Sequence, residues 1–406
     1  MTRAEPPVTY FEPGRGNLRL LIPTRRLFWF FPMALSLILS GCSGSTNFSG
    51  STPALPNGQT GSVVPLGAAP GNCYFSGGTP STCSTSTPLG TSGITALATV
   101  AYGTAPSQTN ALFVGEANGA ISYVTVPTTS APPTTINSCV TGSGFPVLSL
   151  ALIPGSATPG ILFYASSAGV TFETAGTSNC TTLSGSSGIA TSSVLTYNSK
   201  TSQIVGVTTA GAYFTCSSTP SCTAPAVPLP NFKGATVHVT AIASDPQYPV
   251  VYVTTSTNGS YAVNIYAVSG TTLSSLGSYS GGELSAPAGI AVFHGSNPAQ
   301  NYCTNTTGGC NFLYVVNAGD NALTQYVLTY TLSGGTPTGV SLNQFNGAYL
   351  GCDLFDPSAL TAIANPALGA PAVFLGENGT SLGPCLGVAN GTSFGNNVTA
   401  YTVMGE

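Results

Sequence analysis

Short runs of β-branched and aromatic residues, separated by Gly, Asn, Ser and Pro, recur along the chain from about residue 92 onwards. Each run is followed by a turn and then by a second run, a pattern that indicates two antiparallel β-strands. The paired runs are 112–115 with 120–124, 161–164 with 169–172, 204–207 with 212–214, 251–253 with 263–266, 313–315 with 323–326, and 373–375 with 398–401. No segment offers a sustained helical stripe, and 50 Gly with 31 Pro would interrupt one.

A further apolar run precedes each pair and completes a repeating unit. These first runs are 94–98, 147–151, 194–197, 239–243, 289–293 and 360–364. Small residues recur in them, as expected where several strands meet at a crowded central axis. A repeat of about 40–60 residues with three or four strands is typical of a β-propeller. The rival fold, a pair of β-sandwiches, leaves unexplained why all the units share one internal order.

We therefore predict an all-β fold, a β-propeller of six blades. A seventh blade stays open as an alternative, because a degenerate one could be shared between residues 60–90 and the C-terminus. In a closed ring, an N-terminal strand such as Ser62–Pro65 is expected to pair with the last blade and cover its open edge.

The unit resembles the YVTN-type repeat of the family that includes the lactonase-like β-propellers. The best match is Phe312-Leu-Tyr-Val-Val-Asn-Ala-Gly-Asp-Asn-Ala-Leu-Thr-Gln-Tyr-Val-Leu328, which is similar to the family's Tyr-Val-x-Asn, Asn, Val, Tyr pattern. Residues 241–254 resemble its strand–turn–strand opening. The resemblance covers about residues 92–404, is strongest in the last three units, and implies the propeller fold. It does not imply one activity, because a single fold carries many functions.

The N-terminal residues predict export and lipid attachment. Arg25 and Arg26 precede fifteen apolar or small residues, too few for a membrane span of about 20. The run ends in Leu39-Ser40-Gly41-Cys42, which resembles a bacterial lipobox, whose cysteine thiol takes a diacylglyceryl group. The alternative is an ordinary secretory signal that an unrelated cysteine happens to follow. The export route is a separate question, because the two arginines fit the twin-arginine route as well as the Sec route.

This assignment predicts three parts of the chain. Residues 1–41 form a lipoprotein signal peptide, residues 42–70 form a flexible tether rich in Ser, Gly and Pro, and residues 71–406 form the propeller domain. The cell envelope is the expected location, with the protein anchored by lipid. Ser43, rather than Asp, after the lipidated cysteine favours the outer membrane.

The charge left after Cys42 excludes some partners. After Cys42 the chain has two lysines, Lys200 and Lys233, no arginine and nine carboxylates, so its formal charge is −7. Two lysines cannot form the basic patch that binding to nucleic acid requires, so we expect no nucleic-acid partner. A hydrolase that relies on an arginine to hold a developing anion is disfavoured for the same reason.

Ten cysteines follow Cys42, an even number that suits disulfides in an oxidising compartment. Metal binding by these cysteines is the competing interpretation, but there is no CxxC pair and neither His238 nor His294 has a cysteine at ligand spacing. The expected pairs are Cys73 with Cys83, Cys139 with Cys180, Cys216 with Cys222, Cys303 with Cys310, and Cys352 with Cys385.

Three carboxylates occupy the same turn, between the second and third strands of their units. These loop carboxylates are Glu116, Asp320 and Glu377. They could bind calcium or a polar ligand near the mouth of the channel, since hard cations need several oxygens. Turn chemistry is the simpler interpretation, because Asn-Gly and Asp-Asn favour tight hairpins. Whether a metal is bound stays unknown, and no other cofactor is expected.

We therefore expect a binding or scaffolding module rather than an enzyme. The expected partners are the membrane, through the lipid anchor, and an envelope protein or a glycan. The alternative is a lactonase-like hydrolase that uses a metal held by the loop carboxylates. His238 and His294 lie at or beside first strands, where they could carry protons or act as hydrogen-bonded rim residues.

Overall fold

The computed structural model describes residues 62–66, 73–77, 92–104, 108–126, 136–184, 187–218, 221–224, 227–232, 236–295, 310–344, 349–350, 356–363, 373–378 and 396–404. The chain divides into two compact units, Met1–Ser43 and Gly44–Glu406, and all of these residues belong to the second. Every regular element among them is a β-strand. No helix in the described ranges is long and apolar enough to cross a membrane.

The described strands form six antiparallel sheets, and each sheet follows the chain order of its unit. The first three sheets are β3 (Ile94–Tyr102), β4 (Thr109–Glu116), β5 (Ile121–Val126) and β6 (Asn137–Val140); β7 (Ser149–Ile153), β8 (Gly160–Ser166), β9 (Gly169–Ala175) and β10 (Cys180–Thr182); and β11 (Ser193–Asn198), β12 (Gln203–Thr208), β13 (Ala212–Cys216) and β14 (Val227–Pro228). The next two are β15 (His238–Ser244), β16 (Val250–Thr257), β17 (Ser260–Ser269) and β18 (Thr272–Tyr279); and β19 (Pro287–Gly295), β20 (Cys310–Asn317), β21 (Ala322–Ser333) and β22 (Thr336–Gln344), with β23 (Tyr349–Leu350) beside β21. The last is β24 (Pro357–Ala362), β25 (Val373–Glu377) and β26 (Asn396–Met404), with β1 (Ser62–Leu66) and β2 (Cys73–Gly77) beside β26.

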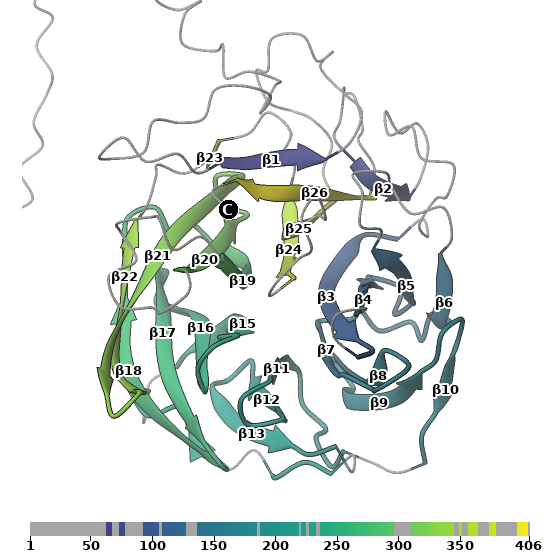
Figure 1. Ribbon diagram of the computed structural model, residues 1–406, viewed down its shortest axis with the longest axis horizontal. Coiled ribbons are helices and arrows are strands. Elements are labelled where there is room, and N and C mark those ends of the chain that lie inside the picture. The colour runs from purple at the N-terminus through teal and green to yellow at the C-terminus, as the bar shows by residue number, and fades with distance from the viewer. Residues whose placement is uncertain are drawn as a thin grey trace, which may run out of the picture. The chain divides into compact units, whose positions relative to one another are not determined.

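The sheets are arranged around a central axis, as in a β-propeller (Figure 1). The first strand of each sheet contacts the first strands of both neighbouring sheets, in the cycle β3, β7, β11, β15, β19, β24 and back to β3. The predicted all-β propeller fold is therefore confirmed. Every predicted first run and every predicted pair of runs overlaps strands of the structure within the described residues.

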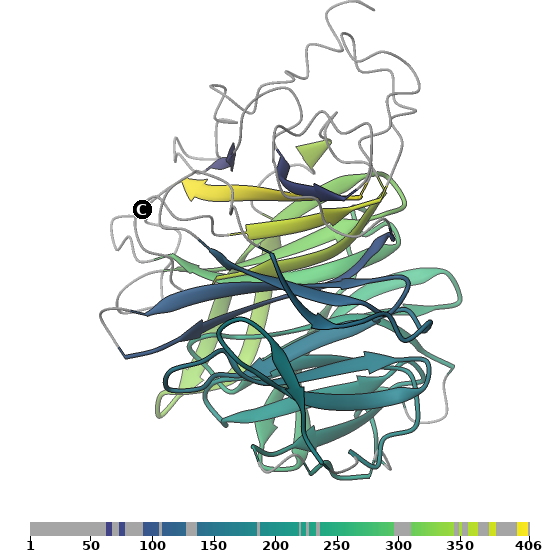
Figure 2. The same cartoon turned by 90° about the vertical axis from the view of Figure 1, so that its right-hand side faces the viewer.

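The ring closes where the two ends of the second unit meet. Strand β1 pairs with β26 along Ser62–Leu66, which is the pairing predicted for an N-terminal strand (Figures 1 and 2). This strand lies inside the segment 42–70 assigned to the tether, so ordered sheet begins before residue 71. The physical reason is that its backbone supplies hydrogen bonds to the otherwise open edge of β26.

The second strand of each sheet is the most deeply buried. In β4, for example, Leu112, Phe113 and Val114 are each 0% exposed although neighbouring side chains point to opposite faces. Both faces of such a strand are covered by adjacent sheets, so a continuous apolar run is required there instead of alternation. This is why these runs were the clearest strand signal in the sequence.

Neighbouring sheets approach closely at two equivalent glycines. A Cβ on Gly115 would lie 2.6 Å from Cγ1 of Val147, and a Cβ on Gly376 would lie 2.7 Å from Cγ2 of Ile94. Each glycine belongs to a second strand, and each contacted side chain comes from the start of the next unit. Any larger residue would push the two sheets apart.

Candidate functional site: the central cavity and the seams around it

A central cavity of about 380 Å³ lies among the first strands of all six sheets. Its wall combines small apolar residues, such as Ala98, Ala151 and Ala241, with hydroxyl side chains. The Ser and Thr residues of the first strands that line it are Thr95, Thr99, Ser149, Thr196, Thr240, Ser244, Ser358 and Thr361, and Tyr197 of β11 adds a phenol hydroxyl. Among the described residues, Asp245 is the single charged residue in the lining, and it is 0% exposed. The described wall is therefore neutral at its surface and combines hydroxyl groups with apolar side chains.

Several of these hydroxyls connect first strands that are not paired through their backbones. We call the contact between two neighbouring sheets a seam and name it by their first strands. Ser149 Oγ accepts a hydrogen bond from the backbone N–H of Leu195 at 2.8 Å, across the β7–β11 seam. Thr196 donates to Ser244 at 3.2 Å across the next seam. Thr99 donates to the backbone oxygen of Ala362 at 2.6 Å, between β3 and β24. These hydroxyls thus connect neighbouring sheets at the wall of the cavity.

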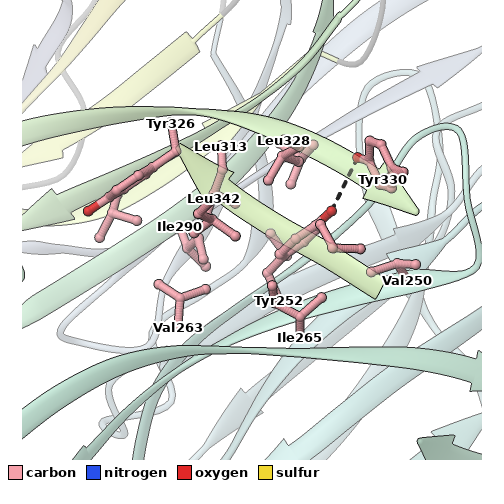
Figure 3. Close-up of a cluster of buried hydrophobic side chains, with 14 of the residues drawn as sticks. Val250, Tyr252, Val263, Ile265, Ile290, Leu313, Tyr326, Leu328, Tyr330 and Leu342 are labelled. Atoms are coloured by element: carbon pink, nitrogen blue, oxygen red, sulfur yellow. Dashed lines mark hydrogen bonds between the residues drawn. The ribbon is translucent and has the colours of Figure 1, made fainter. Parts of the chain in front are cut away.

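Asp245 follows β15 and joins two sheets through a buried network. Its Oδ1 accepts hydrogen bonds from the backbone N–H of Gln247 at 2.8 Å and of Tyr248 at 3.0 Å, which closes the turn. Its Oδ2 accepts from the hydroxyl of Tyr252 at 2.9 Å and from that of Tyr330, which belongs to β21 of the next sheet. Figure 3 shows Tyr252 and Tyr330 directed toward each other within the apolar cluster between these sheets.

The network continues between the same two sheets, through β20 and β19. Asn311 Nδ2 donates to Asp245 Oδ1 at 3.0 Å and to the Tyr330 hydroxyl at 2.8 Å. The Oδ1 of Asn311 lies 2.7 Å from Nδ1 of His294, and Nε2 of His294 lies 3.0 Å from Nε2 of Gln247. His294 is therefore a half-buried, hydrogen-bonded residue between the two sheets, in line with the core or rim role that was one of its two predicted roles.

Burial is the main influence on the titration of this group. Removal from water raises the pKa of Asp245, and hydrogen bonds from Tyr330, Gln247, Tyr252 and Tyr248 oppose that rise without cancelling it. Burial also raises the pKa values of both tyrosines well above their usual range, so their hydroxyls stay protonated as donors. The arrangement is a structural connection between sheets, and Asp245 itself is 0% exposed at the cavity wall.

The loop carboxylates occupy the equivalent turns that the sequence assigned to them, but differ in burial. Glu116 ends β4 and is 1% exposed, Glu377 ends β25 and is 3% exposed, and Asp320 is exposed in the turn between β20 and β21. In the described residues, the one group of three His, Cys, Asp or Glu side chains with ligand atoms within 4.8 Å of one another contains none of them. Calcium binding by the loop carboxylates stays a prediction.

Two of the five predicted disulfides are confirmed, Cys139–Cys180 and Cys216–Cys222. Cys83, Cys303, Cys352 and Cys385 lie outside the described residues, as does the lipidation candidate Cys42. Cys73 and Cys310 are placed in β2 and β20 by their backbones alone. The close group of three side chains consists of Cys139, Cys180 and Glu173. Because its sulfurs are oxidised, it has no thiolate with which to bind a metal.

No known family model matches the chain, and no curated protein matches it. Solved structures do match it. A protein of Thermus thermophilus described as a putative oxidoreductase (glucose dehydrogenase) is 14% identical over 77% of this chain and 98% of its own, with a TM-score of 0.43. An auxiliary nutrient binding protein from Bacteroides thetaiotaomicron is 10% identical over 72% and 66%, with a TM-score of 0.43. The β-propeller domain of Cps50 (Swd1) from Myceliophthora thermophila is 9% identical over 76% and 82%, with a TM-score of 0.38.

Sequence reasoning missed both the cavity hydroxyls and the Asp245 network. One signal could have revealed the network: Asn198 ends the first strand of its unit, and Asp245 directly follows the first strand of the next unit. In the structure Asn198 Oδ1 accepts from the backbone N–H groups of Lys200 at 3.0 Å and Thr201 at 3.1 Å, the same turn that Asp245 forms. Each side chain also bonds to the next sheet, Asn198 through Nδ2 to the oxygen of Val250 at 3.3 Å.

Proposed function

We propose that the protein is a lipid-anchored β-propeller of the cell envelope that acts as a binding or scaffolding module. The lipobox-like residues Leu39–Cys42 support the lipid anchor, and Ser43 supports sorting to the outer membrane. The repeat pattern of residues 312–328 supports membership of the YVTN-type propellers, with the six sheets as six blades.

The central cavity is the observation that carries the binding role. Its volume of about 380 Å³ lies in the range of small-molecule sites in proteins. Its accessible wall offers hydroxyl groups and small apolar patches, without a cation that would hold a phosphate or a carboxylate. The ligand that fits is uncharged and carries hydroxyl groups, which describes a segment of a neutral glycan.

A variant that fills the cavity tests this role. Ala101 is exposed and lines the cavity on β3, so Ala101→Trp places a large side chain in it. Ser274→Trp is the matched control, because Ser274 is exposed on the outer strand β18 and does not line the cavity. Each lipidated protein is extracted from envelopes in detergent, purified, and analysed by mass spectrometry for co-purifying molecules.

We expect neutral glycan fragments to accompany the natural protein and Ser274→Trp, and to be lost from Ala101→Trp. Equal recovery in all three proteins would exclude the cavity as the binding site. Co-purification of a protein alone, unaffected by Ala101→Trp, would leave scaffolding through an outer face and remove the glycan assignment. Recovery of the protein without detergent from a soluble fraction would contradict the lipid anchor.

A further inference from the structure

The Cys139–Cys180 disulfide joins two neighbouring sheets at their outer strands. Cys139 lies on β6 and Cys180 on β10, each the fourth strand of its sheet. Both cysteines are half-buried, and Asn179 and Thr181 on either side of Cys180 are exposed. A reagent in solution can therefore approach this bond from the rim of the ring.

A carboxylate lies beside both sulfurs. Glu173 on β9 is opposite Thr182 of β10, so its side chain is on the same sheet face as that of Cys180, two residues away. A carboxylate oxygen of Glu173 and the two sulfurs are all within 4.8 Å of one another. One water molecule, or a small rotation of the glutamate, bridges such a distance.

We propose that Cys139–Cys180 is a thiol–disulfide exchange site at which Glu173 gives a proton to the departing sulfur. The co-reactant is a dithiol. Its thiolate attacks Sγ of Cys180, a mixed disulfide forms, the S–S bond breaks, and Cys139 leaves with the electron pair. The Glu173 carboxyl protonates Cys139. The second thiol of the reagent then loses its proton to water and attacks the reagent sulfur of the mixed disulfide, and the departing Cys180 thiolate takes a proton from water. The protein gains two thiols, the reagent becomes a disulfide, and water reprotonates Glu173.

The surroundings favour the protonated form of Glu173. Burial raises the pKa of Glu173, so a proton is retained to a higher pH than on an exposed glutamate. Among the described residues, the titratable group that interacts with it is Tyr164 on β8, whose own pKa is raised by burial and by Glu173. After Cys42 the chain has only two lysines and no arginine, so proton transfer replaces the usual cationic stabilisation of a leaving thiolate.

The second disulfide of the structure is an internal comparison. Cys216–Cys222 joins the end of β13 to the segment that follows it, and the two cysteines are six residues apart in the sequence. Cys216 is 1% exposed, and among the described side chains no third ligand-type group lies as close to this pair as Glu173 does to the other. One sample therefore reports on both kinds of disulfide under identical conditions.

The experiment measures the rate at which dithiothreitol reduces each pair in the folded protein. Samples taken at several pH values are alkylated, digested and quantified by mass spectrometry, and each rate is divided by the concentration of dithiothreitol thiolate. Glu173→Gln removes the transferable proton and keeps the shape, and Glu173→Asp restores a carboxyl group if the amide unfolds the sheet. Glu283→Gln is the matched control, since Glu283 is half-buried against Tyr279 and Tyr326 in another sheet pair.

We expect the corrected rate at Cys139–Cys180 to exceed that at Cys216–Cys222, and to fall as pH rises through the raised pKa of Glu173. In Glu173→Gln this rate should drop by about tenfold or more at low pH and lose its pH dependence, whereas Glu283→Gln keeps both. Equal corrected rates at the two disulfides, a flat profile in the natural protein, or an unchanged profile in Glu173→Gln would each overturn the proposal.

Discussion

Replacing Asp245 tests whether the buried network holds the β15–β18 sheet to the β19–β22 sheet, or whether apolar packing alone does so. Asp245→Ala removes the acceptor of five hydrogen bonds. Asp245→Asn keeps one carbonyl oxygen, which is sufficient for the two backbone N–H groups of the turn. The equivalent turn at Asn198 already uses an amide in this way. Comparing the two variants therefore separates the contribution of the turn to stability from the contribution of the hydrogen bonds between sheets.

The expected loss follows from which donors find another acceptor. The hydroxyls of Tyr252 and Tyr330 are 3.2 Å apart and can bond to each other, and Asn311 keeps its bond to Tyr330 at 2.8 Å. The backbone N–H groups of Gln247 and Tyr248 have no such replacement. Two unsatisfied donors at about 1–3 kcal/mol each predict a loss of about 2–6 kcal/mol for the alanine variant. Because both turn residues are half-buried, the lower half of that range applies, and the asparagine variant should lose less than the alanine variant.

The pH dependence has a definite sign. Burial raises the pKa of Asp245 in the folded protein, whereas in the unfolded chain an aspartate titrates near about 3.9. The folded state thus keeps its proton to a higher pH than the unfolded state. The contribution of this group to the free energy of unfolding is fully present below about pH 4 and is lost as pH rises through the folded-state pKa. Asparagine does not titrate, so Asp245→Asn lacks this loss.

Urea unfolding of the natural protein and each variant, at a series of pH values between 4 and 8, measures both effects. The unfolding free energy of the natural protein minus that of Asp245→Asn should fall as pH rises. The other titrating groups are present in both proteins, so their contributions cancel in this difference. Asn198→Ala is the control for the turn, because it removes two backbone acceptor bonds without removing a titrating group. A difference that stays flat or increases with pH, or an alanine variant as stable as the natural protein, would refute the reasoning.

Three further predictions concern other parts of the chain. Gly376→Ala should destabilise the protein by about 1–3 kcal/mol, because its Cβ would collide with Ile94, whereas Gly282→Ala, with open space around its Cβ, should be neutral in the same urea experiment. If the three loop carboxylates serve only as turn residues, calcium should leave the melting temperature of the natural protein unchanged, and changing each of them to Asn should shift stability by less than about 1 kcal/mol. A calcium-dependent gain in the free energy of unfolding, about 2.7 kcal/mol at a hundred times the dissociation constant and lost in the triple variant, would instead establish a shared ion site. Cys42→Ser should leave unprocessed precursor without labelled palmitate, and a correctly cleaved soluble product would contradict the lipid anchor.

The strands were predictable where packing imposes a distinct pattern. The buried run at 111–114 is covered on both faces, and this made its apolar sequence continuous. The fourth strands gave no comparable signal, since β10 is only Cys180–Thr182 and β14 only Val227–Pro228. Such strands lie at the outer edge, where one face meets water and polar residues suffice. Their position follows from the sheet and not from their own sequence.

The two disulfides show how far spacing alone can predict a pairing. Cys216 and Cys222 are six residues apart, close enough for proximity in the chain to identify them. Cys139 and Cys180 are separated by 41 residues and meet because neighbouring sheets align their outer strands. The Asp245 network depends still more on the fold, since its bonds reach Asn311 and Tyr330, 66 and 85 residues away.

Scarcity of charge explains why the seams are built as they are. With only two lysines after Cys42, ion pairs cannot connect six sheets, so hydroxyl bridges such as that from Thr196 to Ser244 take their place. Two seams carry additional chemistry, a buried carboxylate in one and a disulfide beside Glu173 in another. The same scarcity leaves the cavity wall neutral. The ligand that we propose for the cavity would be selected by shape and by hydrogen bonds to hydroxyls, because the described wall exposes no charge that could attract an ion in its place.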